Sequence, residues 1–125
     1  MPTDRPWKIL VVDDNPINIE LAADVLELAG CQVESASSGE EALAKVFASP
    51  PDLVLMDLRM PGIDGVEATK LLKNDLRSYE VPVVALTASV MKGDRERILA
   101  LGFDGFIEKP ILPGTFAKLV LDHLS

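Results

Sequence analysis

Acidic side chains follow two apolar runs of the sequence, and their spacing suits metal chemistry. Asp13 and Asp14 directly follow the run at residues 9–12, and Asp57 follows the run at 53–56. If the two runs are neighbouring parallel strands, the three carboxylates meet at one edge of a sheet. Clustered carboxylates repel one another unless a cation neutralises them, and an all-oxygen ligand set suits magnesium. The sequence therefore predicts a Mg²⁺ site at these three residues.

Strands are expected at residues 8–13, 32–36, 53–57, 83–87 and 105–108, because apolar, β-branched runs alternate there with helical patterns. Such alternation is typical of a parallel sheet with helices on both faces. Right-handed crossovers favour the strand order 2-1-3-4-5, in which the first and third strands are neighbours where the order reverses. We therefore predict a flavodoxin-like, doubly wound (βα)5 α/β domain whose carboxylates lie at this switch point.

Two further strand ends add groups that can bind an anion. Thr87 closes the fourth expected strand, and Lys109 follows the fifth. A carboxylate can attack phosphorus, and the charge that spreads over the phosphoryl oxygens must be met by a metal and fixed donors. In this interpretation Asp13 and Asp14 hold magnesium and Asp57 is the nucleophile. Thr87 and Lys109 then bind the transferred group.

Four motifs, in order along the chain, resemble the response-regulator receiver domain of two-component signalling. They are Val-Val-Asp-Asp-Asn at 11–15, the run from Leu-Met-Asp to Asp-Gly at 55–65, Leu-Thr-Ala at 86–88 and Glu-Lys-Pro at 108–110. The resemblance covers residues 1–125, with a short tail at about 1–7. It extends both to stand-alone cell-cycle regulators and to the receivers of hybrid kinases, and we expect the stand-alone form.

The resemblance implies a role for each residue of the acidic cluster. Asp57 would accept a phosphoryl group from a phosphohistidine of a sensor kinase or phosphotransfer protein. Magnesium would be bound by Asp14, Asp57 and the backbone carbonyl of Arg59, and by Asp13 through water. Such a domain is a regulatory phosphoacceptor rather than an enzyme, although intrinsic self-phosphorylation and self-dephosphorylation are expected.

The resemblance also implies a conformational switch. Phosphorylation of Asp57 adds charge and acceptor oxygens that would draw Thr87 toward the new group. Phe106 would then turn inward, although an ordinary core role in both states is the simpler alternative. The Lys109–Pro110 bond would be the cis peptide of the family, which X-Pro bonds permit at modest cost.

Partners are expected on two surfaces. A downstream protein would bind the face formed by the fourth helix, fifth strand and fifth helix, with the domain a monomer or a phosphorylation-dependent dimer. A kinase or phosphotransfer protein would dock near the first helix, which we expect to bury Ile17 and Leu28. Its expected outward face carries Asn18, Ala22 and Leu26.

Composition narrows the possible functions. The net charge of −8 opposes nonspecific attraction to nucleic acid, which rewards clustered Lys and Arg. No apolar run approaches the ~20 residues of a membrane span, and the first residues lack the apolar core of a secretory signal. A cytoplasmic location is therefore expected. The single cysteine, Cys31, cannot form an internal disulfide.

Three other functions compete with this interpretation. A hydrolase of the haloacid dehalogenase type needs a second Asp two residues after the nucleophile as general acid, but that position is Arg59. A flavodoxin-like electron carrier is disfavoured because Asp13 and Asp14 would repel the phosphate of its cofactor. A receiver-like binding module that never accepts phosphate stays open, because a sequence cannot prove phosphoryl transfer.

Overall fold

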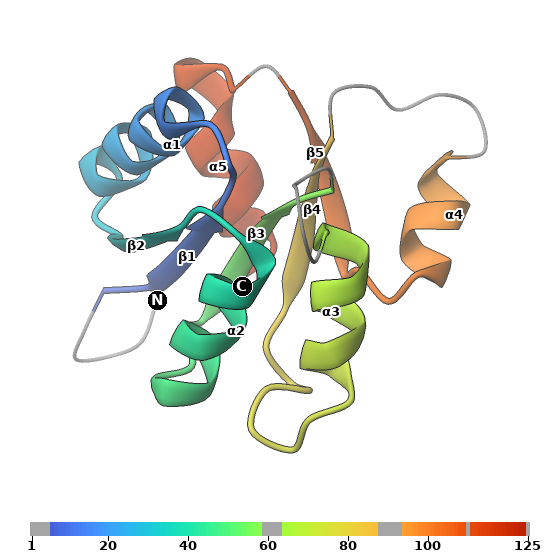
Figure 1. Ribbon diagram of the computed structural model, residues 1–125. Coiled ribbons are helices and arrows are strands. Elements are labelled where there is room, and N and C mark those ends of the chain that lie inside the picture. Colours follow the sequence, from blue (N-terminus) through green and yellow to red (C-terminus); the bar gives the residue numbers. More distant parts are fainter. Residues whose placement is uncertain (1–5, 59–63, 88–93, 110, 125) are drawn as a thin grey trace.

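The five strands of the central sheet run parallel in the order β2-β1-β3-β4-β5 (Figure 1). A computed structural model describes residues 6–58, 64–87, 94–109 and 111–124. The strands are β1 (Lys8–Val12), β2 (Gln32–Ala36), β3 (Leu53–Asp57), β4 (Val83–Thr87) and β5 (Gly105–Glu108). The predicted order is confirmed, and the only difference in strand bounds is that the first strand ends at Val12 instead of Asp13.

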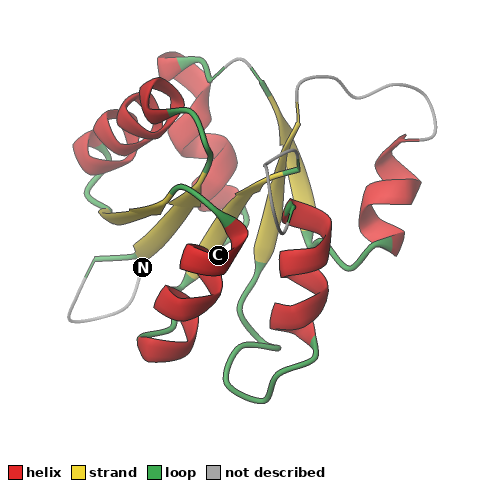
Figure 2. Ribbon diagram, in the orientation of Figure 1, coloured by secondary structure: helices red, strands yellow, loops and turns green. Residues whose placement is uncertain are grey.

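Helices cover both faces of the sheet, as Figure 2 shows. They are α1 (Pro16–Leu28), α2 (Gly39–Ala48), α3 (Gly65–Lys73), α4 (Asp94–Ala100) and α5 (Pro113–Asp122). Successive strand side chains point to opposite faces, so each buried strand serves two core clusters. Leu55 packs with α1 and α5, whereas its neighbour Met56 packs with α2, α3 and α4. This three-layer arrangement leaves the carboxyl edge of the sheet open for a site.

Polar caps fix where three of the helices begin. The Asn15 side chain accepts a hydrogen bond from the backbone N–H of Ile17 at 2.9 Å, and Pro16 occupies the first turn of α1. The Ser38 hydroxyl accepts from Glu41 N–H at 3.1 Å, and Asp64 caps α3 in the same way. Because Asn15 lies two residues after Asp13, the cap also sets the direction in which the chain leaves the acidic edge.

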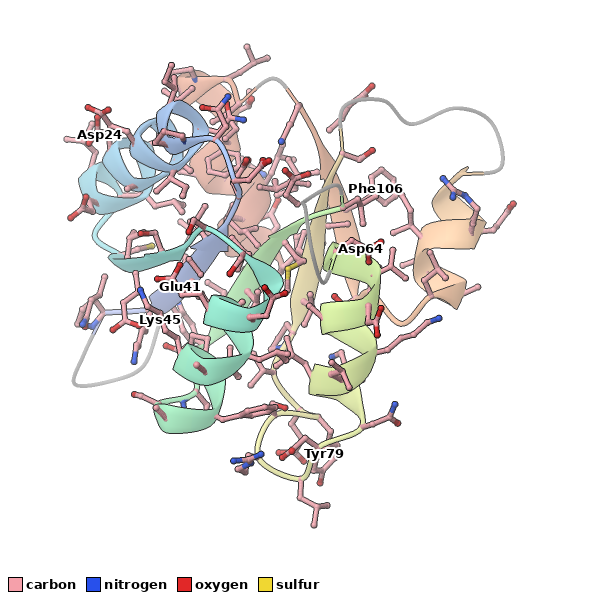
Figure 3. All side chains as sticks on the ribbon, viewed as in Figure 1. Asp24, Glu41, Lys45, Asp64, Tyr79 and Phe106 are labelled. Atoms are coloured by element: carbon pink, nitrogen blue, oxygen red, sulfur yellow. The ribbon has the colours of Figure 1, made fainter. Side chains whose placement is uncertain are left out.

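The predicted inward face of α1 is wrong in part. Ala22 and Leu26, which we expected on the outside, are fully buried, whereas Ile17 is 71% and Leu28 90% exposed. Asp24 marks the outward side of the helix in Figure 3. Apolar residues surround most of this helix, so the sequence pattern fits two rotations about its axis. Packing against the sheet and α5 selects the rotation that buries Ala22 and Leu26.

Asp104 joins three elements at the edge of the sheet opposite the acidic residues. Its carboxylate accepts hydrogen bonds from Lys73 Nζ at 2.7 Å and from Val83 N–H at 2.8 Å. Its own N–H donates to the Val83 carbonyl at 2.8 Å. The side chain therefore connects the loop before β5 to the start of β4 and the end of α3.

We expect Asp104→Ala to lower the free energy of unfolding by about 1–2 kcal/mol, because the Val83 N–H loses the carboxylate that accepts from it and the Lys73 ammonium keeps only its bond to the Val81 carbonyl among the described residues. Urea denaturation measures this loss. Asp122→Ala is the matched control, because it removes an exposed ion pair with Lys118 at 3.4 Å whose expected contribution is below about 0.5 kcal/mol. Equal losses in the two variants would contradict the connecting role of Asp104.

Candidate functional site

Three carboxylates lie together at the carboxyl edge of β1 and β3. Oxygens of Asp13, Asp14 and Asp57 all lie within 4.8 Å of one another. The parallel pairing of Val12 with Met56 accounts for this, because the residues that follow these two must emerge side by side. Asp13 and Asp57 are buried and Asp14 is exposed. The strand order thus brings together the three residues that the sequence singled out.

The ammonium group of Lys109 lies between two of these carboxylates. Its Nζ atom is 3.1 Å from Asp13 Oδ2 and 3.5 Å from Asp57 Oδ2. The backbone N–H of Lys109 donates to the Thr87 carbonyl at 2.7 Å, which holds the end of β4 beside this lysine. A positive charge of the chain therefore already offsets part of the repulsion among the carboxylates.

The Asp13 carboxylate is held by donors on both oxygens. Oδ1 accepts from Asn15 N–H at 2.9 Å. Oδ2 accepts from Asn18 Nδ2 at 3.3 Å as well as from Lys109 Nζ. All three partners donate to this carboxylate, which is only 1% exposed. Asn18, which we had expected on an outward docking face, thus contacts the acidic cluster instead.

Thr87 and Phe106 lie on adjacent strands near the same edge. Thr87 is the last residue of β4 and is buried, and it pairs in register with Glu108. Phe106 is half-buried and packs against the cluster beneath α2, α3 and α4, where Figure 3 shows it facing α4. Two further predicted residues, Arg59 and Pro110, lie outside the described residues. The predicted cis peptide between Lys109 and Pro110 therefore lies outside them as well.

Gly65, the first residue of α3, makes a close approach that the sequence analysis did not predict. A Cβ atom built on Gly65 would lie 2.0 Å from the carbonyl oxygen of Asp57 and 3.0 Å from Leu58 Cα. Only a residue without a side chain fits at that distance. The start of α3, which Asp64 caps, therefore packs through Gly65 directly against the backbone of Asp57.

The donor set fits magnesium. Asp13, Asp14 and Asp57 offer hard carboxylate oxygens from a partly open edge, which leaves room for water ligands. Thiol and imidazole groups, which softer metals prefer, are absent from the cluster that these three residues form. When bound, a divalent cation would reduce the repulsion that Lys109 offsets only in part.

Comparison with known proteins identifies the family. The model of the response regulator receiver domain matches residues 9–121. The chain belongs to this family. The chain is 39% identical to the polar-differentiation response regulator DivK of Brucella anthropi over 120 residues. The aligned region covers 96% of this chain and 98% of that relative.

Solved structures of the same family superimpose closely on this receiver domain. The chemotaxis response regulator CheY4 of Vibrio cholerae gives a TM-score of 0.89 at 30% identity, over 95% of this chain and 99% of that one. The receiver domain of the sensor histidine kinase PA1611 from Pseudomonas aeruginosa gives 0.85 at 30% identity, over 95% and 98%. That second structure has a magnesium ion coordinated in its active site cleft.

The family confirms the function expected from the sequence. Receiver domains are phosphoacceptor switches that interact with histidine kinases and downstream targets, and they are regulatory domains rather than true enzymes. Nothing in the comparisons favours a phosphohydrolase or a phosphate-independent binding module. Within the part of the chain that the structure describes, no helix has the length and apolar character needed to cross a bilayer.

Proposed function

We propose that this receiver domain, taken as residues 1–125 with a short tail at 1–7, accepts its phosphoryl group on Asp57. The donor is a phosphohistidine of a kinase or phosphotransfer protein, and the reaction requires magnesium. One observation carries the assignment: Asp57 is the last residue of the buried central strand β3, it belongs to the acidic cluster, and its Oδ2 lies 3.5 Å from the ammonium group of Lys109. Asp13 is also buried and lies 3.1 Å from Lys109, and its two oxygens accept hydrogen bonds from Asn15, Asn18 and Lys109, which suits a supporting role.

Asp57 supplies the attacking oxygen. A bond forms between this oxygen and phosphorus while the bond from phosphorus to the donor imidazole nitrogen breaks, and that nitrogen keeps the electron pair. Lys109 and the Thr87 hydroxyl meet negative charge on the transferred oxygens. Magnesium, when bound, neutralises further charge there. Asp14 and Asp57 would ligate the ion directly, with the carbonyl of Arg59 as a third ligand and Asp13 acting through water.

Phosphorylation changes the surface through Thr87 and Phe106. The new phosphoryl group brings negative charge and strong acceptor oxygens to Asp57, which attract the Thr87 hydroxyl. Because Lys109 N–H is bonded to the Thr87 carbonyl and β4 pairs with β5, movement at Thr87 is transmitted to β5. Phe106 then turns inward, and the α4-β5-α5 face binds a downstream protein or a second copy of the domain.

The phosphodonor protein docks beside the start of α1. Ile17 is 71% exposed one turn from the acidic edge, and Leu112, just before α5, is 57% exposed. Both residues lie at the starts of helices that pack against each other, three residues after Asp14 and Lys109 respectively, and we infer that they supply an apolar surface for the donor protein. This surface replaces the one that we expected from Ala22 and Leu26. The proposed setting of this exchange is the cytoplasm.

Intact mass measurement tests the assignment. Purified protein incubated with acetyl phosphate and magnesium is expected to gain one phosphoryl group, and the adduct should be lost on treatment with hydroxylamine, which cleaves acyl phosphates. Chelation of the metal before the reaction should suppress the gain. A chain that gains no mass in the presence of magnesium would contradict the proposal.

A further inference from the structure

Asn18 reaches into the acidic cluster from the first turns of α1. Its side-chain Nδ2 lies 3.3 Å from Asp13 Oδ2, the same oxygen that accepts from Lys109 Nζ at 3.1 Å. The other oxygen of Asp13 accepts from Asn15 N–H at 2.9 Å. The carboxylate is therefore held from the helix side by a backbone donor and an amide, and from the β5 side by an ammonium.

Of these three donors, Asn18 alone is both neutral and a side chain. Lys109 carries charge, so its removal would alter the attraction of the site for any cation. Asn15 donates through its backbone, so no substitution removes that bond without altering the helix cap. Removing the Asn18 amide leaves all three carboxylates and the ammonium in place, and only the orientation of Asp13 loses support.

We propose that Asn18 is a positioning residue for magnesium, an inference that rests on the proposed function of the site. The amide holds the buried Asp13 carboxylate in the orientation from which it can serve the ion. Without the amide, Lys109 is the one remaining donor to Asp13 Oδ2 among the described residues, and the carboxylate must be reoriented when the metal enters. Hydrogen-bond partners just outside a metal's ligands act in this way in many proteins, by fixing ligand direction.

Isothermal titration calorimetry with magnesium chloride tests the proposal without phosphorylation. We expect Asn18→Ala to raise the dissociation constant for magnesium about three- to tenfold. This loss of affinity is smaller than is usual when a metal ligand loses a hydrogen-bond partner, because Asn15 N–H still donates to Asp13 Oδ1. Asn18→Leu, which keeps the bulk of the side chain without its donor, should give the same rise. Asn18→Gln retains an amide and should recover most of the affinity. Asn74→Ala is the matched control, since Asn74 is exposed at the end of α3.

A second readout separates positioning from a general loss of structure. The rate of phosphorylation by acetyl phosphate should need three- to tenfold more magnesium for half-saturation in Asn18→Ala, while the rate at saturating magnesium stays near that of the wild type. A variant that is merely less stable would not shift the half-saturation point.

The outcomes are distinguishable. Wild-type magnesium affinity in both Asn18→Ala and Asn18→Leu would overturn the positioning role and leave the proposed function standing. A lower maximal rate at unchanged magnesium affinity would overturn it as well. If the wild-type protein itself fails to bind magnesium, the proposed function falls and the role of Asn18 falls with it.

Discussion

Asp57→Asn is expected to remain folded and to gain no phosphoryl group from acetyl phosphate under conditions in which the wild type is modified. Asparagine matches the size of the buried aspartate, so packing at the end of β3 is preserved. An amide is a far poorer nucleophile than a carboxylate, and the change also removes one of three charges that attract magnesium. Intact mass before and after incubation measures the loss, and circular dichroism checks the fold.

Asp64→Asn is the matched control for this experiment. Asp64 is an exposed aspartate at the N-cap of α3, where it accepts from Glu67 N–H at 2.9 Å, and asparagine caps helices about as well. This variant should gain the phosphoryl group as the wild type does. An equal gain in Asp57→Asn would place the acceptor elsewhere, and peptide mapping would then have to locate it.

Local signals in the sequence were sufficient to predict the sheet and its acidic edge. Short apolar runs such as that ending at Met56 favour strands by their length and by the turn residues on either side, so the strands were predicted almost to the residue. Once parallel strands are assumed, connection rules leave few orders, and the meeting of Asp13 with Asp57 follows from topology alone. The caps at Asn15 and Ser38 were equally local.

Features that depend on packing could not be predicted in the same way. The sequence of α1 is apolar around most of its circumference, so its periodicity did not decide whether Ala22 or Ile17 faces the core. Asn18 was assigned to the surface by the same choice of rotation. With Ala22 turned inward, Asn18, four residues earlier and so on the same face, points toward Asp13. A wrong rotation of one helix therefore concealed a residue of the site.

The contact between Gly65 and Asp57 was also beyond local signals, because it depends on the distance between α3 and β3. A glycine after the cap Asp64 is compatible with many helix starts. Here the backbone of Asp57 lies so close that a methyl group on Gly65 would meet its carbonyl oxygen at 2.0 Å and its carbonyl carbon at 2.9 Å. These are backbone atoms of a strand buried on both sides, which cannot move aside singly.

Gly65→Ala is therefore expected to lower the free energy of unfolding by about 3 kcal/mol, at the upper end of overpacking costs, and to impair phosphorylation strongly. To relieve the contact, either α3 moves outward or the end of β3 shifts, and the second movement carries Asp57 away from Lys109 and Asp13. Urea denaturation measures the stability, and the acetyl phosphate assay at a concentration of urea where the variant is still folded measures the activity.

Gly114→Ala provides the comparison, because a Cβ atom at Gly114 meets nothing within 4 Å and the residue lies in the first turn of α5. Alanine there should be neutral or slightly stabilising, since it restricts the unfolded chain and favours helix. If Gly65→Ala were as stable and as readily phosphorylated as Gly114→Ala, α3 could not pack directly against the backbone of Asp57. The sheet alone would then determine where the reactive carboxylate lies. If Gly65→Ala loses stability and phosphorylation as predicted, the position of Asp57 depends on the start of α3 as well as on the sheet. The packing of α3 then helps to orient the nucleophile.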